Sequence, residues 1–242
     1  MRTVLAAARS VITYLAISVY VLVAGAFALA VCVPLGWKDC LYRLGHGGVA
    51  LALGCAGIRY RVDGRHHVPA GTAVVFCSNH QSNVDPPVLF RALHPRLHIL
   101  FKAELRQLPI LGTVMEAGGF VAVERENRDA AMTSIDAAAA SIRAGHSFLI
   151  FPEGTRSRTG EMLPFKKGGF IMAIKAQAPI VPVAITGGRD SMRKGSWIVH
   201  PARVTVRIGE PVATAGCSLD DRDALIAVVR ERIEALVRQG PL

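Results

Sequence analysis

The stretch of sequence that decides the fold is Ala73–Pro87, which reads AVVFCSNHQSNVDPP. Its first part, AVVFCS, is a short apolar run ended by polar residues, which is the pattern of a buried β-strand. Aspartate is favoured as a helix N-cap and proline is tolerated in the first helical turn, so a helix is predicted to begin at Asp85, with the aspartate as its cap. His80 then lies in the loop between strand and helix, and this loop can bring His80 and Asp85 together. The plainer alternative is that Asp85 only caps the helix and His80 is only a polar loop residue.

From Arg59 onward the chain alternates short β-branched runs with helical stretches. The predicted strands span 59–62, 73–78, 98–102, 119–124, 147–151, 180–186 and 203–209. The predicted helices span 85–94, 104–117, 128–144, 167–177 and 219–238. Strands that alternate with helices of this length indicate an α/β fold, a mostly parallel mixed sheet flanked by helices. Ligands of such sheets bind beyond the carboxyl ends of the strands, where this sequence places His80, Lys102, Arg125 and the turn at 151–158.

The N-terminal part of the chain is predicted to be a membrane-associated helical segment. Ser10–Trp37 is a run of 28 residues without a charge, and about 20 apolar residues suffice to cross a bilayer as a helix. A signal peptide is the alternative, because Arg2 and Arg9 precede the run, but its apolar region has only about 7–15 residues. A second uncharged run of 15 residues, Leu44–Ile58, suits an interfacial, re-entrant or buried core helix. We therefore divide the chain into an anchor, 1–58, and an α/β domain, 59–242.

The balance of charges indicates an anionic partner. The net charge is +10, yet only 6% of the residues are aromatic and no nucleic-acid-binding signature is present. Membrane lipid or an acidic carrier therefore explains the charge better than nucleic acid does. Lys38, Arg43, Arg59 and Arg61 lie beside the apolar runs, which favours an anionic, cytoplasm-facing leaflet. The predicted location is the cytoplasmic membrane, with the α/β domain on its cytoplasmic face; whether the first run spans the membrane or re-enters it stays open.

The cysteines and paired histidines point to no metal site. The five cysteines, Cys32, Cys40, Cys55, Cys77 and Cys217, are odd in number and scattered. This arrangement predicts no disulfide framework and no zinc cage, and it fits a reducing compartment. His66 and His67 are adjacent rather than at helical ligand spacing, which indicates surface histidines. The sequence calls for no cofactor.

Four short motifs occur in order between residues 79 and 183, and together they carry a resemblance to a known family. The first is Asn79, His80 and Asp85, in the pattern Asn-His-x4-Asp, and the second is Gly119–Arg125, GFVAVER. The third is Phe151–Ser157, FPEGTRS, and the fourth is Val181–Val183, VPV. In these motifs the chain resembles the glycerolipid acyltransferases, specifically the bacterial 1-acyl-glycerol-3-phosphate (lysophosphatidate) acyltransferases. Glu124 stands where many members have aspartate, which is a mild departure.

The resemblance implies that residues 59–242 are an acyltransferase catalytic domain. Its expected reaction moves a fatty acyl group from an acyl-CoA or acyl-carrier-protein thioester to the sn-2 hydroxyl of lysophosphatidate, which makes phosphatidic acid in phospholipid biosynthesis. The residues fit this chemistry: His80 is the expected general base, and Asp85 orients it as the aspartate of a Ser-His-Asp triad does. No Gly-x-Ser-x-Gly elbow supplies a serine, so the acceptor hydroxyl takes the place of the nucleophile.

The cationic and turn residues of the motifs are candidates for substrate binding. Arg125 and Arg156 can hold a phosphate by bidentate hydrogen bonds, a role that the resemblance also implies. Glu153 is expected to position either the acceptor or the loop, and Gly154 permits close backbone approach; Thr155 lies between Gly154 and Arg156 in the same motif. Lys102 is a further candidate, and a solvated strand end is an equal alternative for it.

The same residues also allow a different nucleophile, a different acceptor and a different class of protein. Cys77 could be a covalent nucleophile, but residues 77 and 80 of an extended chain point to opposite faces, which predicts that Cys77 packs in the core. Lyso-ornithine lipid or another lysolipid is an alternative acceptor. A hydrolase, which passes the acyl group to water, and a non-catalytic membrane lipid-binding protein are alternatives of other classes.

Overall fold

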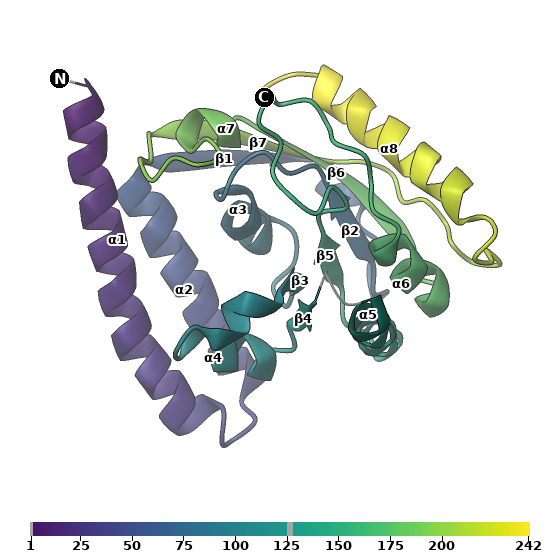
Figure 1. Cartoon of the computed structure of the whole chain (residues 1–242), viewed down its shortest axis with the longest axis horizontal. Coiled ribbons are helices and arrows are strands. Elements are labelled where there is room, and N and C mark those ends of the chain that lie inside the picture. Colours follow the sequence, from purple (N-terminus) through teal and green to yellow (C-terminus); the bar gives the residue numbers. More distant parts are fainter. Residues whose placement is uncertain (1, 125–127) are drawn as a thin grey trace.

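The structure, a computed structural model, describes residues 2–124 and 128–242 (Figure 1). Its centre is a seven-stranded sheet in the order β1-β7-β6-β2-β5-β3-β4. Every adjacent pair is parallel except β6 and β7, which are antiparallel. This confirms the predicted mostly parallel mixed sheet. The strands are β1 (Ile58–Asp63), β2 (Val75–Ser78), β3 (His98–Lys102), β4 (Val121–Val123), β5 (Phe148–Ile150), β6 (Ile180–Thr186) and β7 (Ala202–Ile208).

Helices cover both faces of the sheet (Figure 1). They are α1 (Arg2–Phe27), which continues as a π-helical turn (Ala28–Cys32), α2 (Lys38–Ala56), α3 (Asp85–Ala92), α4 (Leu111–Ala117), α5 (Arg128–Arg143), α6 (Gly168–Ala176), α7 (Gly188–Ser191) and α8 (Arg222–Arg238). Alternate residues of β2 enter two cores: Phe76 packs with α2 and α3, whereas Val75 and Cys77 pack with α5, α6 and α8. Successive side chains of a strand point to opposite faces of the sheet, so β2 is buried on both faces.

One predicted helix, 104–117, is broken in the structure. A 3₁₀ helix covers Ala103–Gln107 and α4 begins only at Leu111. Leu108, between them, has an extended backbone (φ −68°, ψ 122°). Pro109 explains the break, because proline has no N–H to donate and disfavours a helical residue before it.

The first two helices have different environments. The helical segment Thr3–Cys32, with a mean hydropathy of 2.5, is long and apolar enough to cross a membrane, and only 11% of its most apolar window is buried. In contrast, α2 contributes Tyr42, Leu53 and Ala56 to the core that contains Phe76. Of the alternatives for the second apolar run, the structure thus favours a core helix.

Cys32 and Cys40 are joined by a disulfide, a single pairing that the sequence, which predicted no disulfide framework, did not indicate. The chain between them turns from the end of the π-helical segment into the first turn of α2 and brings the two thiols together. Cys55, Cys77 and Cys217 are free. The cysteine pattern therefore gives no support for a reducing compartment.

Candidate active site

His80 and Asp85 form a hydrogen-bonded pair in the loop after β2. His80 Nδ1 lies 3.0 Å from Asp85 Oδ2; the aspartate side chain is fully buried and the histidine side chain is 15% exposed. A histidine that donates its Nδ1 proton to a carboxylate presents an unprotonated Nε2. Among the described residues no group hydrogen bonds to this nitrogen. The pair thus has the geometry of an oriented general base.

The aspartate serves the loop rather than the helix that follows it. The helix does begin at Asp85, as predicted, but the N-cap position is Val84 and no side chain caps α3. Asp85 Oδ2 instead accepts hydrogen bonds from the backbone N–H groups of Gln81, at 2.6 Å, and Ser82, at 2.7 Å. The predicted N-cap role of Asp85 was therefore wrong. The carboxylate thus binds N–H groups of its own loop in place of those at the start of the helix. These two hydrogen bonds also fix the position of Oδ2, the oxygen that His80 contacts.

Glu153 ties the third motif to the histidine loop. Its Oε1 accepts the backbone N–H of His80 at 2.7 Å, and its Oε2 accepts that of Leu163 at 2.9 Å. The side chain is buried, and this burial raises the pKa of Glu153, although the two backbone donors act in the opposite direction. Since both oxygens are engaged, the geometry favours the loop-positioning alternative for Glu153 over contact with the acceptor.

Further contacts hold the His80 loop against β6 and the turn at 151–158. Asn79 Nδ2 donates to the carbonyl of Ile185 and Asn79 Oδ1 accepts its N–H, at 2.9 and 2.8 Å. The N–H of Ser157 donates to the carbonyl of His80 at 2.9 Å. The ring of Phe151 stacks on the imidazole of His80, with centroids 4.2 Å apart. The first motif therefore meets the third motif and β6, the strand that carries the fourth motif, because parallel strands end at the same edge of the sheet.

Gly154, Thr155 and Arg156 lie in the turn that follows β5. Gly154 has a positive φ of 69°, and the side chain of Lys166 passes over it, where a Cβ would collide. Lys194 was not anticipated from the sequence: its Nζ donates to Thr155 Oγ1 at 2.9 Å and to the carbonyl of Arg156 at 3.1 Å. The half-buried Lys194 thus binds the backbone of the turn that carries the half-buried Arg156, next to Ser157, whose N–H donates to the carbonyl of His80. No sequence signal distinguishes Lys194, because it comes from an irregular segment 38 residues downstream of Arg156.

The described contacts do not join Lys102 to the turn at 151–158. Arg125 lies outside the described residues. Lys102, at the end of β3, is more than half exposed and forms an ion pair with Glu104 at 2.6 Å. This environment matches the alternative of a solvated strand end, and a binding role for Lys102 stays a prediction.

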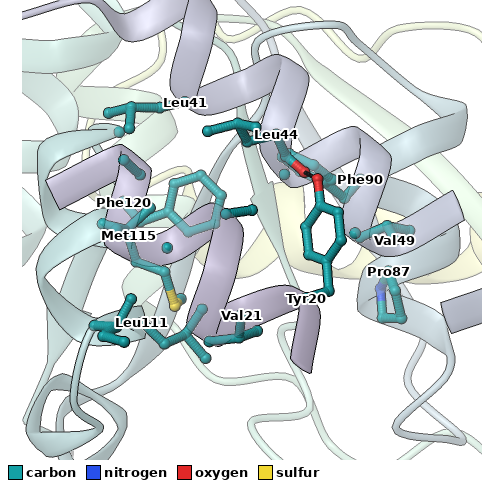
Figure 2. A pocket seen from close by; sticks show the side chains of 18 of the residues that line it. Tyr20, Val21, Leu41, Leu44, Val49, Pro87, Phe90, Leu111, Met115 and Phe120 are labelled. Carbon is teal, nitrogen blue, oxygen red and sulfur yellow. Dashed lines mark hydrogen bonds between the residues drawn. The ribbon is translucent and has the colours of Figure 1, made fainter. Parts of the chain in front are cut away.

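An apolar cavity of about 580 Å³ lies beside the His80–Asp85 loop (Figure 2). Side chains of α1, α2, α3 and α4 line it, together with Phe120, which lies between α4 and β4. The helix residues labelled in Figure 2 are Tyr20, Val21, Leu41, Leu44, Val49, Pro87, Phe90, Leu111 and Met115. The hydroxyl of Tyr20, a polar group at its wall, is engaged by the carbonyl of Leu44 at 2.8 Å. Asn83, Pro86 and Pro87 form the part of the lining that adjoins Asp85. The volume and chemistry fit an extended apolar ligand.

Cys77 is fully buried in the core, as predicted. Burial raises the pKa of its thiol, and the charge of Glu153 adds to the effect. A protonated, inaccessible thiol is a poor nucleophile. Within residues 2–124 and 128–242, no group of three or more His, Cys, Asp or Glu side chains could hold a metal ion.

The chain is similar in sequence to known acyltransferases. A family model described as Acyltransferase matches residues 59–186. Mouse 1-acyl-sn-glycerol-3-phosphate acyltransferase alpha is 34% identical over 185 residues, which cover 76% of this chain and 65% of the mouse protein. The 1-acyl-sn-glycerol-3-phosphate acyltransferase of Limnanthes douglasii is 29% identical, over 90% of this chain and 79% of that one. The chain thus spans slightly less than two thirds of the length of the mouse relative.

A solved structure extends the similarity to the whole fold. The crystal structure of the 1-acyl-sn-glycerophosphate (LPA) acyltransferase PlsC from Thermotoga maritima has a TM-score of 0.86 and 26% sequence identity, and the match covers 99% of this chain and 97% of that one. The family match covers more than half of the chain and includes the His80–Asp85 pair. The chain therefore belongs to the acyltransferase family.

Proposed function

We propose that the protein transfers a fatty acyl group from a thioester donor to the sn-2 hydroxyl of 1-acyl-glycerol-3-phosphate and so forms phosphatidic acid. The observation that carries the proposal is the His80–Asp85 pair, whose Nε2 has no described partner, beside an apolar cavity. The names of the mouse, Limnanthes and Thermotoga relatives support the choice of acceptor. The donor is an acyl-CoA or an acyl-carrier-protein thioester.

The reaction needs no covalent enzyme intermediate. His80 Nε2 takes the proton of the acceptor hydroxyl while its oxygen attacks the thioester carbonyl. Asp85 holds the imidazole by Nδ1 and stabilises the imidazolium that forms. Collapse of the tetrahedral intermediate breaks the C–S bond, and the leaving thiolate takes the proton back from His80. General-base catalysis of this kind contributes roughly 10²–10⁴-fold in rate.

The cavity and the cations are assigned to the two ends of the lipid substrates. The apolar cavity takes a fatty acyl chain, because its lining from α1 to α4 offers aliphatic and aromatic side chains over a length of several turns. Arg156 and Lys194 hold the phosphate of the acceptor together with Arg125, since guanidinium groups bind phosphate bidentately. Lys102 is the further candidate for this role.

The protein is proposed to work at the cytoplasmic membrane, with the catalytic domain, 59–242, on the cytoplasmic side and residues 1–58 as the anchor. The exposed apolar residues of α1 support this arrangement, because apolar area of that extent is stabilised by lipid. The basic residues near the helix ends favour the cytoplasmic leaflet.

The test is an assay of the purified full chain with a labelled acyl group on either CoA or acyl-carrier protein. The acceptors are lysophosphatidate, lyso-ornithine lipid, a neutral lysolipid and water. The proposal expects label in phosphatidate at a rate well above that for the other acceptors. Preferential labelling of ornithine lipid would replace the acceptor, and release of free fatty acid alone would make the protein a hydrolase.

A further inference from the structure

A second recess, separate from the cavity at the active site, lies where α1 meets the edge of the sheet. It has a volume of about 420 Å³ and is lined by Arg9, Gly57, Arg59, Pro201, Ala202 and Arg203. Arg59 and Arg203 stand side by side in the register of the parallel strands β1 and β7. Arg9 reaches the same place from α1. Three exposed guanidinium groups thus surround one hollow.

The three arginines have no acidic partner among the described ion pairs. By contrast, Arg207 on the same strand pairs with Asp63 at 3.0 Å. Gly57 also belongs to the arrangement: it has a positive φ of 70°, and a Cβ there would overlap the guanidinium of Arg9. Like charges gathered without a counter-charge repel one another, so a bound anion stabilises the cluster.

The surroundings of the recess indicate where this anion comes from. On α1 the neighbours of Arg9 along the outward face are apolar and exposed; Leu5, Val11 and Ile12 are 64%, 56% and 60% exposed. Trp197 is 80% exposed, and its carbonyl accepts a hydrogen bond from Tyr14 of α1 at 2.8 Å. An exposed tryptophan beside an apolar helix face is typical of the membrane interface, where lipid phosphates lie.

We propose that Arg9, Arg59 and Arg203 bind the phosphate group of an anionic membrane phospholipid. Guanidinium groups match phosphate oxygens bidentately, and arginines at the membrane surface favour anionic lipid by roughly fivefold each. β1 and β7 begin at the edge of the sheet where β6 ends, since β6 and β7 are antiparallel. The His80 loop leaves the parallel neighbour of β6 at this same edge. A lipid held at the recess therefore keeps the catalytic edge at the membrane surface. The site does not depend on the identity of the acyl acceptor.

The test measures which lipids lie next to Trp197. Trp37 and Trp197 are the two tryptophans of the chain, so Trp37→Phe leaves Trp197 as the reporter. The protein is reconstituted in phosphatidylcholine vesicles that contain one fifth phosphatidylglycerol, with bromine on the acyl chains of one lipid or the other. Brominated lipid quenches tryptophan only at short range. In the protein that carries only Trp37→Phe, we expect brominated phosphatidylglycerol to quench Trp197 at least threefold more than it would if the two lipids were mixed at random around the protein.

Two variants with the same loss of charge separate the site from general electrostatics. The first variant is Arg9→Gln/Arg59→Gln/Arg203→Gln, in which we expect quenching by brominated phosphatidylglycerol to fall to the value for random mixing. The control variant is Arg222→Gln/Arg232→Gln/Arg238→Gln on α8, in which we expect phosphatidylglycerol to stay enriched next to Trp197. Circular dichroism and thermal unfolding establish that each variant is folded, and the three single variants replace the triple variant if it is not. If phosphatidylglycerol is enriched next to Trp197 equally in both variants, or is lost equally from both, the three arginines of the recess do not form a lipid site. Inorganic phosphate or glycerol 3-phosphate at 10 mM distinguishes the source of the phosphate. If either abolishes the enrichment, or if in lipid-free detergent either binds more weakly to the Arg9, Arg59 and Arg203 triple variant than to the unchanged protein, a soluble phosphate is the ligand and the lipid assignment is wrong.

Discussion

The carboxylate of Asp85 lies against Gly188, with no space between them for even one side-chain carbon. A Cβ on Gly188 would overlap Asp85 Oδ1 and come within 3.2 Å of the Cβ of Ser82. This Oδ1 is buried and has no hydrogen-bond partner among the described residues. Gly188, the first residue of α7, thus forms the wall behind the aspartate and keeps Oδ2 toward His80. It lies outside all four motifs.

Gly188→Ala is therefore expected to impair catalysis without removing any catalytic group. The added methyl group displaces the carboxylate, and a shift of about 1 Å in a catalytic constellation can cost roughly a hundredfold in rate. We expect kcat to fall by about ten- to a hundredfold, with little change in KM for the acceptor. Gly54→Ala on α2 is the matched control, because a Cβ there meets no atom within 4 Å. Equal kinetics of Gly188→Ala and Gly54→Ala would show that Gly188 does not position Asp85.

The apolar cavity predicts a change in chain-length preference. Ala24 lines the cavity, whereas Ala26 lies on the exposed side of the same helix. Ala24→Phe fills part of the space, so kcat/KM for long-chain donors should fall by tenfold or more relative to short-chain donors. Ala26→Phe should leave that ratio unchanged. The measurement compares kcat/KM for donors that differ only in acyl length. If the ratio of long-chain to short-chain kcat/KM is the same in Ala24→Phe and Ala26→Phe, the cavity does not bind the acyl chain.

Arg156 predicts a loss that depends on the phosphate of the acceptor. Lysine cannot reproduce the planar fork of a guanidinium, and loss of a hydrogen bond to a charged group costs about 1.5–3 kcal/mol. Arg156→Lys should therefore lower kcat/KM for lysophosphatidate by roughly ten- to a hundredfold. Its rate with a lysolipid that lacks an accessible phosphate should stay near the wild-type value. Arg158→Lys, an exposed neighbour, is the control. An unchanged rate with lysophosphatidate would contradict the phosphate-binding role.

His98 predicts a loss of stability in mild acid. Burial, together with the charges of His146, Lys38 and His94, lowers the pKa of His98 to about 4 from its ordinary 6.5. The native state therefore binds this proton less tightly than the unfolded state, so the stabilisation present above pH 6.5 is lost as the pH falls toward 4. In His98→Phe, which keeps an aromatic ring beside Tyr42 and His146, the decrease in Tm between pH 7 and pH 4.5 should be smaller, by about 5 °C. An identical decrease in both proteins would contradict the buried, neutral histidine.

The sequence predicted those parts of the molecule that depend on local patterns. β3 and β6 have the predicted bounds, because apolar runs that are bounded by polar or turn residues specify buried strands. The pairing of His80 with Asp85 followed from the strand, loop and helix around them. The break at Pro109 was also within reach of local rules, since proline disfavours the helix interior.

What the sequence could not give are contacts between distant segments. Gly188 and Lys194 reach the site from about a hundred and about 40 residues away, respectively, and neither has a local pattern that marks it. The N-cap preference suggested the wrong partner for Asp85, because the competing N–H donors of its own loop are apparent only once the loop is folded. Glu153 was ambiguous for the same reason: its role depends on which backbone groups its oxygens meet.

The central claim is that His80 deprotonates the hydroxyl of lysophosphatidate, which then attacks the thioester directly. The most direct measurement is a single-turnover experiment with a labelled acyl thioester, carried out on wild type and His80→Ala with and without lysophosphatidate. We expect wild type to form labelled phosphatidate only when the acceptor is present and to carry no label on the protein in its absence. His80→Ala should be folded and slower by roughly 10²–10⁴-fold. Label trapped on the protein, or a His80→Ala rate near that of wild type, would contradict the mechanism.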